Sequence, residues 1–99
     1  MAAEKNFENR IKKFLKEEGC YFVKYFGCAF TQAGVPDILA CVNGHFVAIE
    51  VKAENGATSY LQDHNVAKIK EAGGVAVVVK PSDFEKLKTL IWGLKNENT

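Results

Sequence analysis

Apolar residues recur at two different spacings along this chain, and the change from one spacing to the other predicts the order of its elements. Between residues 4 and 18 the apolar side chains fall three or four positions apart, which is typical of an amphipathic helix. Helical spacing returns after Ser59 and after Ser82, and each serine precedes a Gln or Glu by three residues, the capping-box pattern. We therefore expect helices at residues 4–18, at 59–72, and from Ser82 through the last apolar stripe.

Short apolar runs predict the strands, which we expect at residues 20–26, 37–42, 45–52 and 75–79. Asn43-Gly44 is a typical type I′ turn sequence, so the second and third strands should form a hairpin. Both faces of this hairpin are mostly apolar, which predicts a sheet covered on both sides, and the unbroken apolar run of the last strand predicts a central, parallel, fully buried strand. The expected fold is α/β, in the order α-β-β-β-α-β-α, with a mixed four-stranded sheet and helices on both faces.

Length and charge limit what such a domain can be. Ninety-nine residues support one modest core, so we expect a single domain over residues 1–99. A formal net charge of +1 neither demands nor excludes a polyanionic partner, so any nucleic-acid footprint must be local. The chain has no stretch approaching the roughly 20 apolar residues that span a bilayer, so we expect no membrane association and a cytoplasmic location, in a bacterium or a phage-infected host cell.

The three cysteines are Cys20, Cys28 and Cys41, an odd number without C-x-x-C spacing. This pattern argues for reduced thiols in a cytosolic protein and against a disulfide framework or a zinc site. We expect all three to be buried as small apolar side chains.

The hairpin register brings two acids together. If Asn43 and Gly44 are the central turn residues, counting back along both strands places Asp37 opposite Glu50. Like charges directly across a ladder repel, so an electropositive third party is expected there, and a divalent metal would serve. Lys52 lies two residues beyond Glu50 and therefore on the same face. The sheet thus presents two carboxylates and an ammonium in one patch.

These residues carry a family resemblance that covers nearly the whole chain. Val35-Pro36-Asp37 followed by Ala48-Ile49-Glu50-Val51-Lys52 matches the P-D…(D/E)-x-K signature of restriction-endonuclease-like nucleases. With Gly34 to Leu39, Phe46 to Lys52 and Ser59-x-x-Gln62, the chain resembles the VRR-NUC family, found as a small stand-alone viral and bacterial protein and at the end of a eukaryotic DNA-repair nuclease. The spacing of a first-helix Glu, the Asp and the Glu-x-Lys also resembles archaeal Holliday-junction resolvases. The implied fold is restriction-endonuclease-like.

The resemblance implies metal-dependent hydrolysis of phosphodiester bonds. Mg²⁺ prefers oxygen ligands and keeps several waters, so Asp37, Glu50 and the carbonyl of Val51 form a sufficient set, and Mn²⁺ should substitute. No organic cofactor is expected. Lys52 would orient or deprotonate the attacking water, or hold the scissile phosphate. The alternative is a purely structural role in a salt bridge to Glu50 or Asp37.

Two further residues have both a catalytic and a structural interpretation. Glu8 stands where the resolvases have a helical Glu, whereas Glu4 falls nearer the centre of the apolar stripe; we favour Glu8, and either acid can equally be a solvated helix carboxylate. Gln62 is the N3 partner of Ser59 in the capping box, yet it shares a helical face directed at the sheet. A site role and a capping role are both open for Gln62, and they do not exclude each other.

The resemblance implies a structure-selective DNA endonuclease, and we expect a Holliday-junction resolvase acting as a homodimer on four-way junctions. Lys24, Phe30 and Thr31 are the candidate DNA contacts, and Tyr25, Phe30 and the last helix with Trp92 are candidates for the dimer surface. The alternatives are a flap or nicking nuclease within a repair complex, and a non-catalytic nucleic-acid-binding module.

Overall fold

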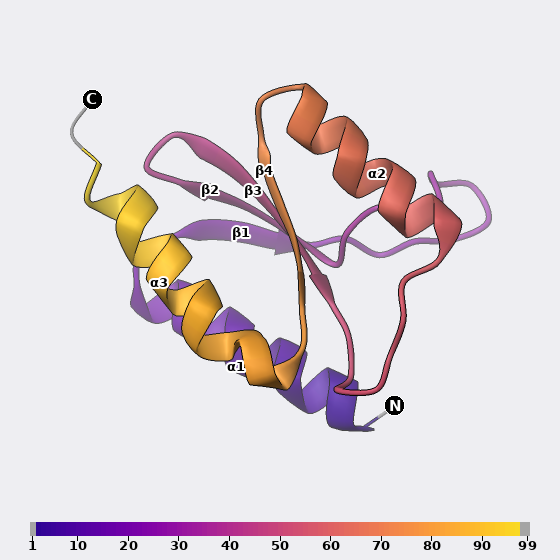
Figure 1. Cartoon of the computed structure of the whole chain (residues 1–99), viewed down its shortest axis with the longest axis horizontal. Coiled ribbons are helices and arrows are strands. Elements are labelled where there is room, and N and C mark those ends of the chain that lie inside the picture. The colour runs from indigo at the N-terminus through magenta and orange to yellow at the C-terminus, as the bar shows by residue number, and fades with distance from the viewer. Residues whose placement is uncertain (1, 98–99) are drawn as a thin grey trace.

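The helices and strands follow one another in the predicted order α-β-β-β-α-β-α (Figure 1). The structure is a computed structural model and describes residues 2–97. Its elements are α1 (Ala2–Glu17), β1 (Tyr21–Lys24), β2 (Ile38–Val42), β3 (His45–Val51), α2 (Tyr60–Glu71), β4 (Val75–Val79), the 3-10 helix η1 (Pro81–Asp83) and α3 (Phe84–Lys95). None of the helices in this part of the chain is long and apolar enough to cross a membrane.

The four strands form one mixed sheet in the order β1-β2-β3-β4. The first three strands are antiparallel, and β4 runs parallel to β3 after the crossover through α2. The hairpin has the predicted register, with Val42 opposite His45, and both Asn43 and Gly44 have positive φ, as a type I′ turn requires. At the other end Ile38 pairs with Ile49, so Asp37 and Glu50 are the next residues along the two strands.

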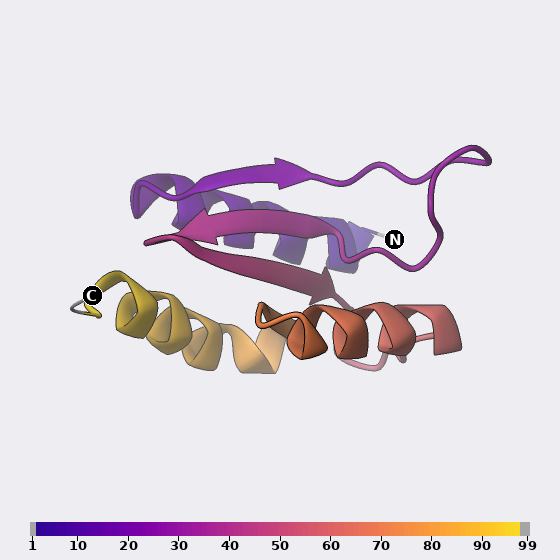
Figure 2. The ribbon, with the colours of Figure 1, turned by 90° about the horizontal axis from the view of Figure 1, so that it is seen from above.

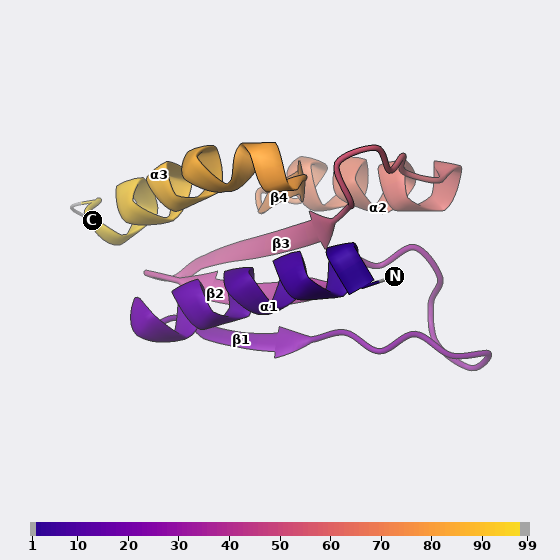
Figure 3. The ribbon, with the colours of Figure 1, turned by 90° about the horizontal axis from the view of Figure 1, so that it is seen from below.

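Helices lie on both faces of the sheet, as expected. In Figure 1 the sheet is viewed almost along its plane, with α2 on one side and α1 and α3 on the other. Figure 3 shows α1 and α3 over their face of the sheet. The core lies on this side and combines the inward stripe of α1 with alternate strand residues and with α3; its largest fully buried members include Phe7, Ile11, Leu15, Ile38, Ile49, Leu87 and Ile91.

The opposite face is covered only in part, so the prediction of a sheet covered on both sides is wrong for β1 and β2. Helix α2 contacts β4 and β3, and Figure 2, viewed from the α2 side, shows β1 and β2 uncovered by any helix of the described chain. Apolar side chains are therefore left at the surface there. We call this surface the open sheet face; it consists of Tyr21, Val23, Leu39, Cys41 and Phe46.

Two more predictions are wrong. The first concerns β4, because a sequence pattern does not give the position of a strand in its sheet. Strand β4 is parallel but lies at the edge of the sheet, and only Ala76 and Val79 are buried in it, so it is neither central nor fully buried. The cysteines are free, but they are not buried: Cys41 is exposed on the open sheet face, Cys28 is exposed in a loop, and Cys20 is half-buried.

The two predicted capping boxes have different outcomes. At α2 the Ser59 hydroxyl accepts from the Gln62 N–H and the Gln62 side chain accepts from the Ser59 N–H, so this box is confirmed. At α3 the box from Ser82 is wrong, because the backbone N–H and hydroxyl of Ser82 both donate to Glu54. Asp83 accepts from the Lys80 N–H instead and precedes the first residue of α3.

Candidate functional site

The candidate site lies at the end of the sheet where β2 begins and where β1 and β3 end. The paired residues of β2 and β3 end here with Ile38 and Ile49. Beyond them, the Val51 N–H donates to the side chain of Asp37, at 2.8 Å from Oδ2. The backbone carbonyl of Asp37 accepts from the Tyr25 N–H at 2.8 Å. The carboxylate of Asp37 is thus held between two strands by backbone geometry.

Glu50 is the most deeply buried acid of the site, with 2% of its surface exposed. Its Oε2 accepts from Gln62 Nε2 at 3.1 Å and lies 3.4 Å from Lys52 Nζ. Its Oε1 is buried and has no hydrogen-bond partner within the described residues. A buried carboxylate oxygen without a partner is costly, so this atom calls for a donor or a cation.

Burial raises the pKa of Glu50 to about 7, and the neighbouring negative charge of Asp37 acts in the same direction. Lys52 opposes this shift but does not cancel it. The two carboxylates that the hairpin register predicted to be neighbours therefore do interact, and near neutral pH the pair does not readily carry both negative charges. A cation bound between them would remove this cost.

Glu8 joins the site through lysines. Its Oε1 lies 2.8 Å from Lys24 Nζ, which is also 3.2 Å from Asp37 Oδ1, and its Oε2 lies 3.2 Å from Lys12 Nζ. Burial alone would raise the pKa of Glu8, but the hydrogen bonds and charges of Lys24 and Lys12 outweigh burial and leave this pKa lowered. Glu8 is therefore held ionised beside the site.

The donor chemistry fits a hard divalent ion at the Asp37 and Glu50 pair. Both side chains offer carboxylate oxygens, the backbone carbonyl of Val51 lies between Glu50 and Lys52, and Glu50 Oε1 has no other partner in the described chain. Residues 2–97 contain no cluster of three or more acidic, His or Cys side chains placed to hold a metal together. The side-chain set is thus the pair alone, which is sufficient for an ion that keeps several waters.

The structure brings most of the predicted residues together. Lys52 and Gln62 contact Glu50, and Glu8 is connected to Asp37 through Lys24. The capping role of Gln62 is confirmed. Gln62 also donates to Glu50, which places it at the site, and a role in catalysis stays a prediction. Glu8, rather than Glu4, is the α1 acid bonded to the site. The DNA candidates differ: Lys24 directs its ammonium at two carboxylates, whereas Phe30 and Thr31 lie in the loop before β2.

That loop is fastened to α2 by a residue that the sequence analysis missed. Asn65 is buried; its Oδ1 accepts from Gln32 Nε2 at 2.9 Å, and its Nδ2 donates to the carbonyls of Ala33 and Leu61. A polar residue within the inward stripe of α2 was the available signal. Phe30 stands at the tip of the loop with 98% of its surface exposed.

Replacing Asn65 with Ala should release the loop. The change removes three hydrogen bonds from a buried position, so we expect the free energy of unfolding to fall by about 1–3 kcal/mol. Amide hydrogen exchange in residues 28–34 should accelerate, because the loop loses its attachment. Asn9→Ala, on the exposed side of α1, is the matched control and should change neither quantity. Unchanged exchange in Asn65→Ala would contradict the role assigned to this residue.

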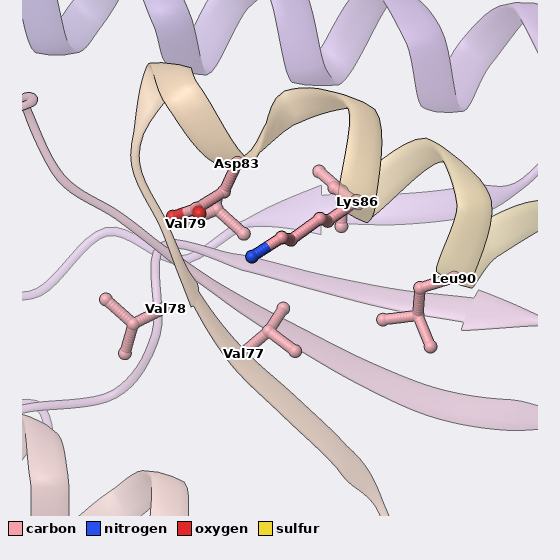
Figure 4. A pocket seen from close by; sticks show the side chains of 7 residues that line it. Val77, Val78, Val79, Asp83, Lys86 and Leu90 are labelled. Carbon is pink, nitrogen blue, oxygen red and sulfur yellow. The ribbon is translucent and has the colours of Figure 1, made fainter.

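Two hollows of the surface differ in their chemistry. One opens beside the site and is lined by Tyr25, Gly34, Val35 and Asp37 together with the loop before β2. The other lies between the edge strand β4 and α3, where Lys86 extends from α3 toward β4 (Figure 4). This second pocket is mostly apolar, and its charged residues are Asp83 and Lys86. Only the first hollow adjoins the acid pair.

Comparison with known proteins gives a family. A family model described as archaeal Holliday junction resolvase (Hjc) matches residues 2–89. No curated protein matches the chain. The matched segment runs from α1 through the entire sheet and into α3, and it includes Glu8, Asp37, Glu50, Lys52 and Gln62. The chain therefore belongs to the archaeal Holliday junction resolvase family of restriction-endonuclease-like nucleases.

Proposed function

We propose that this protein is a Mg²⁺-dependent endodeoxyribonuclease that resolves four-way DNA junctions at the site formed by Asp37, Glu50 and Lys52. One observation carries the proposal. The buried Oε1 of Glu50 has no hydrogen-bond partner within the described chain, and the Glu50 side chain interacts with the negative charge of Asp37, an arrangement that is unfavourable unless a cation binds there. Family membership supplies the reaction class and the substrate.

Each side chain has a distinct part in this proposal. Asp37, Glu50 and the Val51 carbonyl would hold the ion, which when bound polarises the scissile phosphate and makes its water more acidic. Gln62 and Lys52 both contact Glu50 Oε2, so Oε1 is the oxygen that is left without a partner in the described chain. Lys52 is mostly buried, with 14% of its side chain exposed, and its ammonium provides a fixed charge for the phosphate or the attacking water.

A panel of labelled DNA substrates tests the proposal. The protein is incubated with four-way junction, flap, single-stranded and linear duplex DNA, in Mg²⁺, in Mn²⁺ and in EDTA. We expect paired, symmetric cuts in the junction with either metal, and none in EDTA, because the ion is needed to activate the water. Asp37→Asn and Lys52→Ala should both lose cleavage. Cleavage in EDTA, or cleavage that survives Asp37→Asn, would rule out the proposed metal site.

The same panel separates the alternatives. Cleavage of flaps in preference to junctions, or single unpaired nicks, would favour a flap or nicking nuclease within a repair complex. Binding of branched DNA without cleavage in any metal would favour a non-catalytic module. The opposed carboxylates argue against the latter, since a binding module has no need to bring two negative charges together near a phosphate.

Symmetric cutting requires two active sites, so we propose a homodimer. One copy of this chain provides one acid pair, and a twofold assembly supplies the second. The open sheet face supports this proposal because its apolar side chains include Tyr21, 73% exposed, and Phe46, 47% exposed. Contiguous exposed apolar surface of this kind is typical of an interface. Of the surfaces expected from sequence, Phe30 is exposed in the loop, whereas Trp92 partly packs on Phe14.

Placing a charge on the open sheet face should separate the dimer. Phe46→Asp would bury a carboxylate in the interface, so we expect a monomer by size-exclusion chromatography with light scattering at micromolar concentration, and unpaired nicks in place of paired cuts. Tyr60→Asp replaces an aromatic that is 81% exposed outside this face and should leave the dimer intact. A wild-type monomer at this concentration would count against the dimer, and a dimeric Phe46→Asp would place the interface elsewhere.

The proposal also includes the residues that contact DNA and the cellular role of the protein. DNA contacts are proposed at Lys24, Phe30 and Thr31, of which Phe30 has the exposure needed to stack on an unpaired base. The resemblance to VRR-NUC proteins of phages and bacteria, a role in DNA repair and a cytoplasmic location stay predictions.

A further inference from the structure

The loop between β3 and α2 has a residue of the site at each end. Lys52 directly follows β3, and its ammonium lies 3.4 Å from Glu50 Oε2. Gln62 lies in the first turn of α2, where it completes the capping box with Ser59 and donates to the same oxygen at 3.1 Å. The path of the loop, residues 53–58, therefore affects the positions of two side chains that contact Glu50.

The loop is fastened through Glu54 to the chain between β4 and α3. The two carboxylate oxygens of Glu54 accept from the backbone N–H of Ser82 at 2.9 Å and from its hydroxyl at 2.7 Å. Hydrogen bonds to an ionised acceptor are stronger than those between neutral groups, and two of them fix the direction of the carboxylate as well as its place. Figure 1 shows the segment after β3 passing close to the start of α3.

Ser82 makes these bonds instead of capping its own helix. Helix α3 begins at Phe84, and its N-cap residue Asp83 makes no side-chain hydrogen bond to it. A serine cap stabilises a helix by about 1 kcal/mol. Here the serine hydroxyl instead donates to a residue 28 positions earlier in the chain. The serine thus holds the loop beside the site rather than the start of α3.

The fastened loop covers Lys52. The Gly56 N–H donates to the Ala53 carbonyl at 2.9 Å, which closes a tight turn. A Cβ at Gly56 would lie 3.5 Å from the Lys52 Cβ, so this turn packs directly on the lysine. Only 14% of the Lys52 side chain is exposed. Because a lysine has a long, flexible stem, a turn that packs on it limits the positions that the ammonium can take.

We propose that Glu54 and Ser82 are positioning residues for the active site. Together they hold the loop of residues 53–58 against Lys52, so the lysine ammonium stays beside Glu50. This inference rests on the proposed function of that site. Neither Glu54 nor Ser82 needs to contact DNA or the ion, because a displacement of about 1 Å in a group of the site can by itself cost 10²-fold in rate.

Single-turnover cleavage of the four-way junction, with saturating protein and Mg²⁺, tests the inference. Ser82→Ala loses the hydroxyl bond and should cut about tenfold more slowly than the wild type. Glu54→Ala loses both bonds and should cut up to about 10²-fold more slowly. Ser82→Thr keeps both donors and should cut at the wild-type rate. In all three variants the affinities for the junction and, without DNA, for Mn²⁺ should stay within about twofold, since the described loop makes no hydrogen bond to the acid pair.

Two further variants separate positioning from a loss of stability. Asp83→Ala removes the neighbouring hydrogen bond to the Lys80 N–H, and within the described chain Asp83 makes no hydrogen bond to the loop, so this variant should melt earlier without cutting more slowly. The double variant of Ser82→Ala with Glu54→Ala should cut no more slowly than Glu54→Ala, because the two residues act through one contact. In nuclear magnetic resonance spectra, the side-chain amide signals of Gln62 should shift in Glu54→Ala and not in Asp83→Ala.

The possible outcomes are distinct. A wild-type cleavage rate in Glu54→Ala would overturn the inference, and so would an equal loss of rate in Asp83→Ala, since the loss would then follow from a weakened start of α3. A fall in Mn²⁺ or junction affinity that accounts for the slower cleavage would overturn it too. If Glu54→Ala does not fold, Glu54→Gln takes its place and should give an intermediate rate, because one acceptor oxygen remains. A wild type that cuts no DNA would overturn the proposed function as well.

Discussion

Glu50→Gln should stop junction cleavage and at the same time make the metal-free protein more stable at pH 8. The amide cannot replace the carboxylate as a ligand, so we expect the cleavage rate to fall by a factor on the order of 10³. The gain in stability has a separate cause. Burial and the charge of Asp37 raise the pKa of Glu50 to about 7, so the ionised carboxylate is unfavourable in the folded protein, and the neutral amide removes this cost.

The gain in stability from Glu50→Gln should depend on pH, because the protonation of Glu50 differs between the folded and the unfolded chain. Below the ordinary pKa of 4.5, Glu50 is protonated in the folded and the unfolded chain and contributes no difference. Between 4.5 and about 7 the unfolded chain releases the proton while the folded chain keeps it, so this group lowers the stability of the wild type as pH rises. Above about 7 the whole cost is present, roughly 3 kcal/mol.

Thermal melting of wild type and Glu50→Gln in EDTA, from pH 4 to pH 8, measures this difference. The two melting temperatures should agree at pH 4, and the variant should melt roughly 10 °C higher at pH 8. Glu54→Gln, on an exposed loop, is the matched control and should show no comparable pH-dependent gain. Added Mg²⁺ should raise the melting temperature of the wild type at pH 8 and not that of Glu50→Gln. Equal melting temperatures at pH 8 would contradict the buried, unfavourable carboxylate.

The acid pair was predictable because a hairpin with a two-residue turn has only one register. Once Asn43 and Gly44 are assigned to the turn, the opposition of Asp37 and Glu50 follows by counting, and the period of two places Lys52 beside Glu50. The element order was predictable for a similar reason, since helical and strand periods differ strongly. Gln62 followed from its spacing to Ser59.

The position of each element in the layers was not predictable in the same way. An apolar run such as that of β4 predicts that both faces of the strand are covered, here by α2 and α3. It does not predict whether the strand has a neighbour on each side or lies at the edge of the sheet. Leu39 and Cys41 are apolar residues two positions apart on β2, a spacing that is typical of a buried face. Helix α2 does not cover them, and we propose that a second copy of the chain does. The bridge made by Lys24 joins residues from three elements that are remote in sequence, so no local spacing encodes it.

Gly34→Ala should damage the site far more than Gly44→Ala, although both glycines have nearly the same backbone conformation, with φ of 81° and 83°. A Cβ at Gly44 would meet nothing within 4 Å, so that variant carries only the strain of a positive φ, about 1 kcal/mol. A Cβ at Gly34 would lie 2.7 Å from the backbone of Leu61 in α2. No side-chain movement relieves such a contact, so the loop must leave the helix.

The displaced loop leads directly into β2, so we expect Gly34→Ala to shift Asp37 and to slow junction cleavage. Asp37 follows Gly34 by three residues, and a shift of about 1 Å in a catalytic group can cost 10²-fold in rate. We therefore expect Gly34→Ala to cut junctions about 10²-fold more slowly than the wild type and Gly44→Ala to cut within a few-fold of it, in single-turnover assays with excess protein. The stability cost of Gly34→Ala is bounded by the free energy of loop attachment, because the loop can detach while the sheet stays folded. If urea denaturation and cleavage change equally in both variants, the contact between the loop and α2 does not position Asp37.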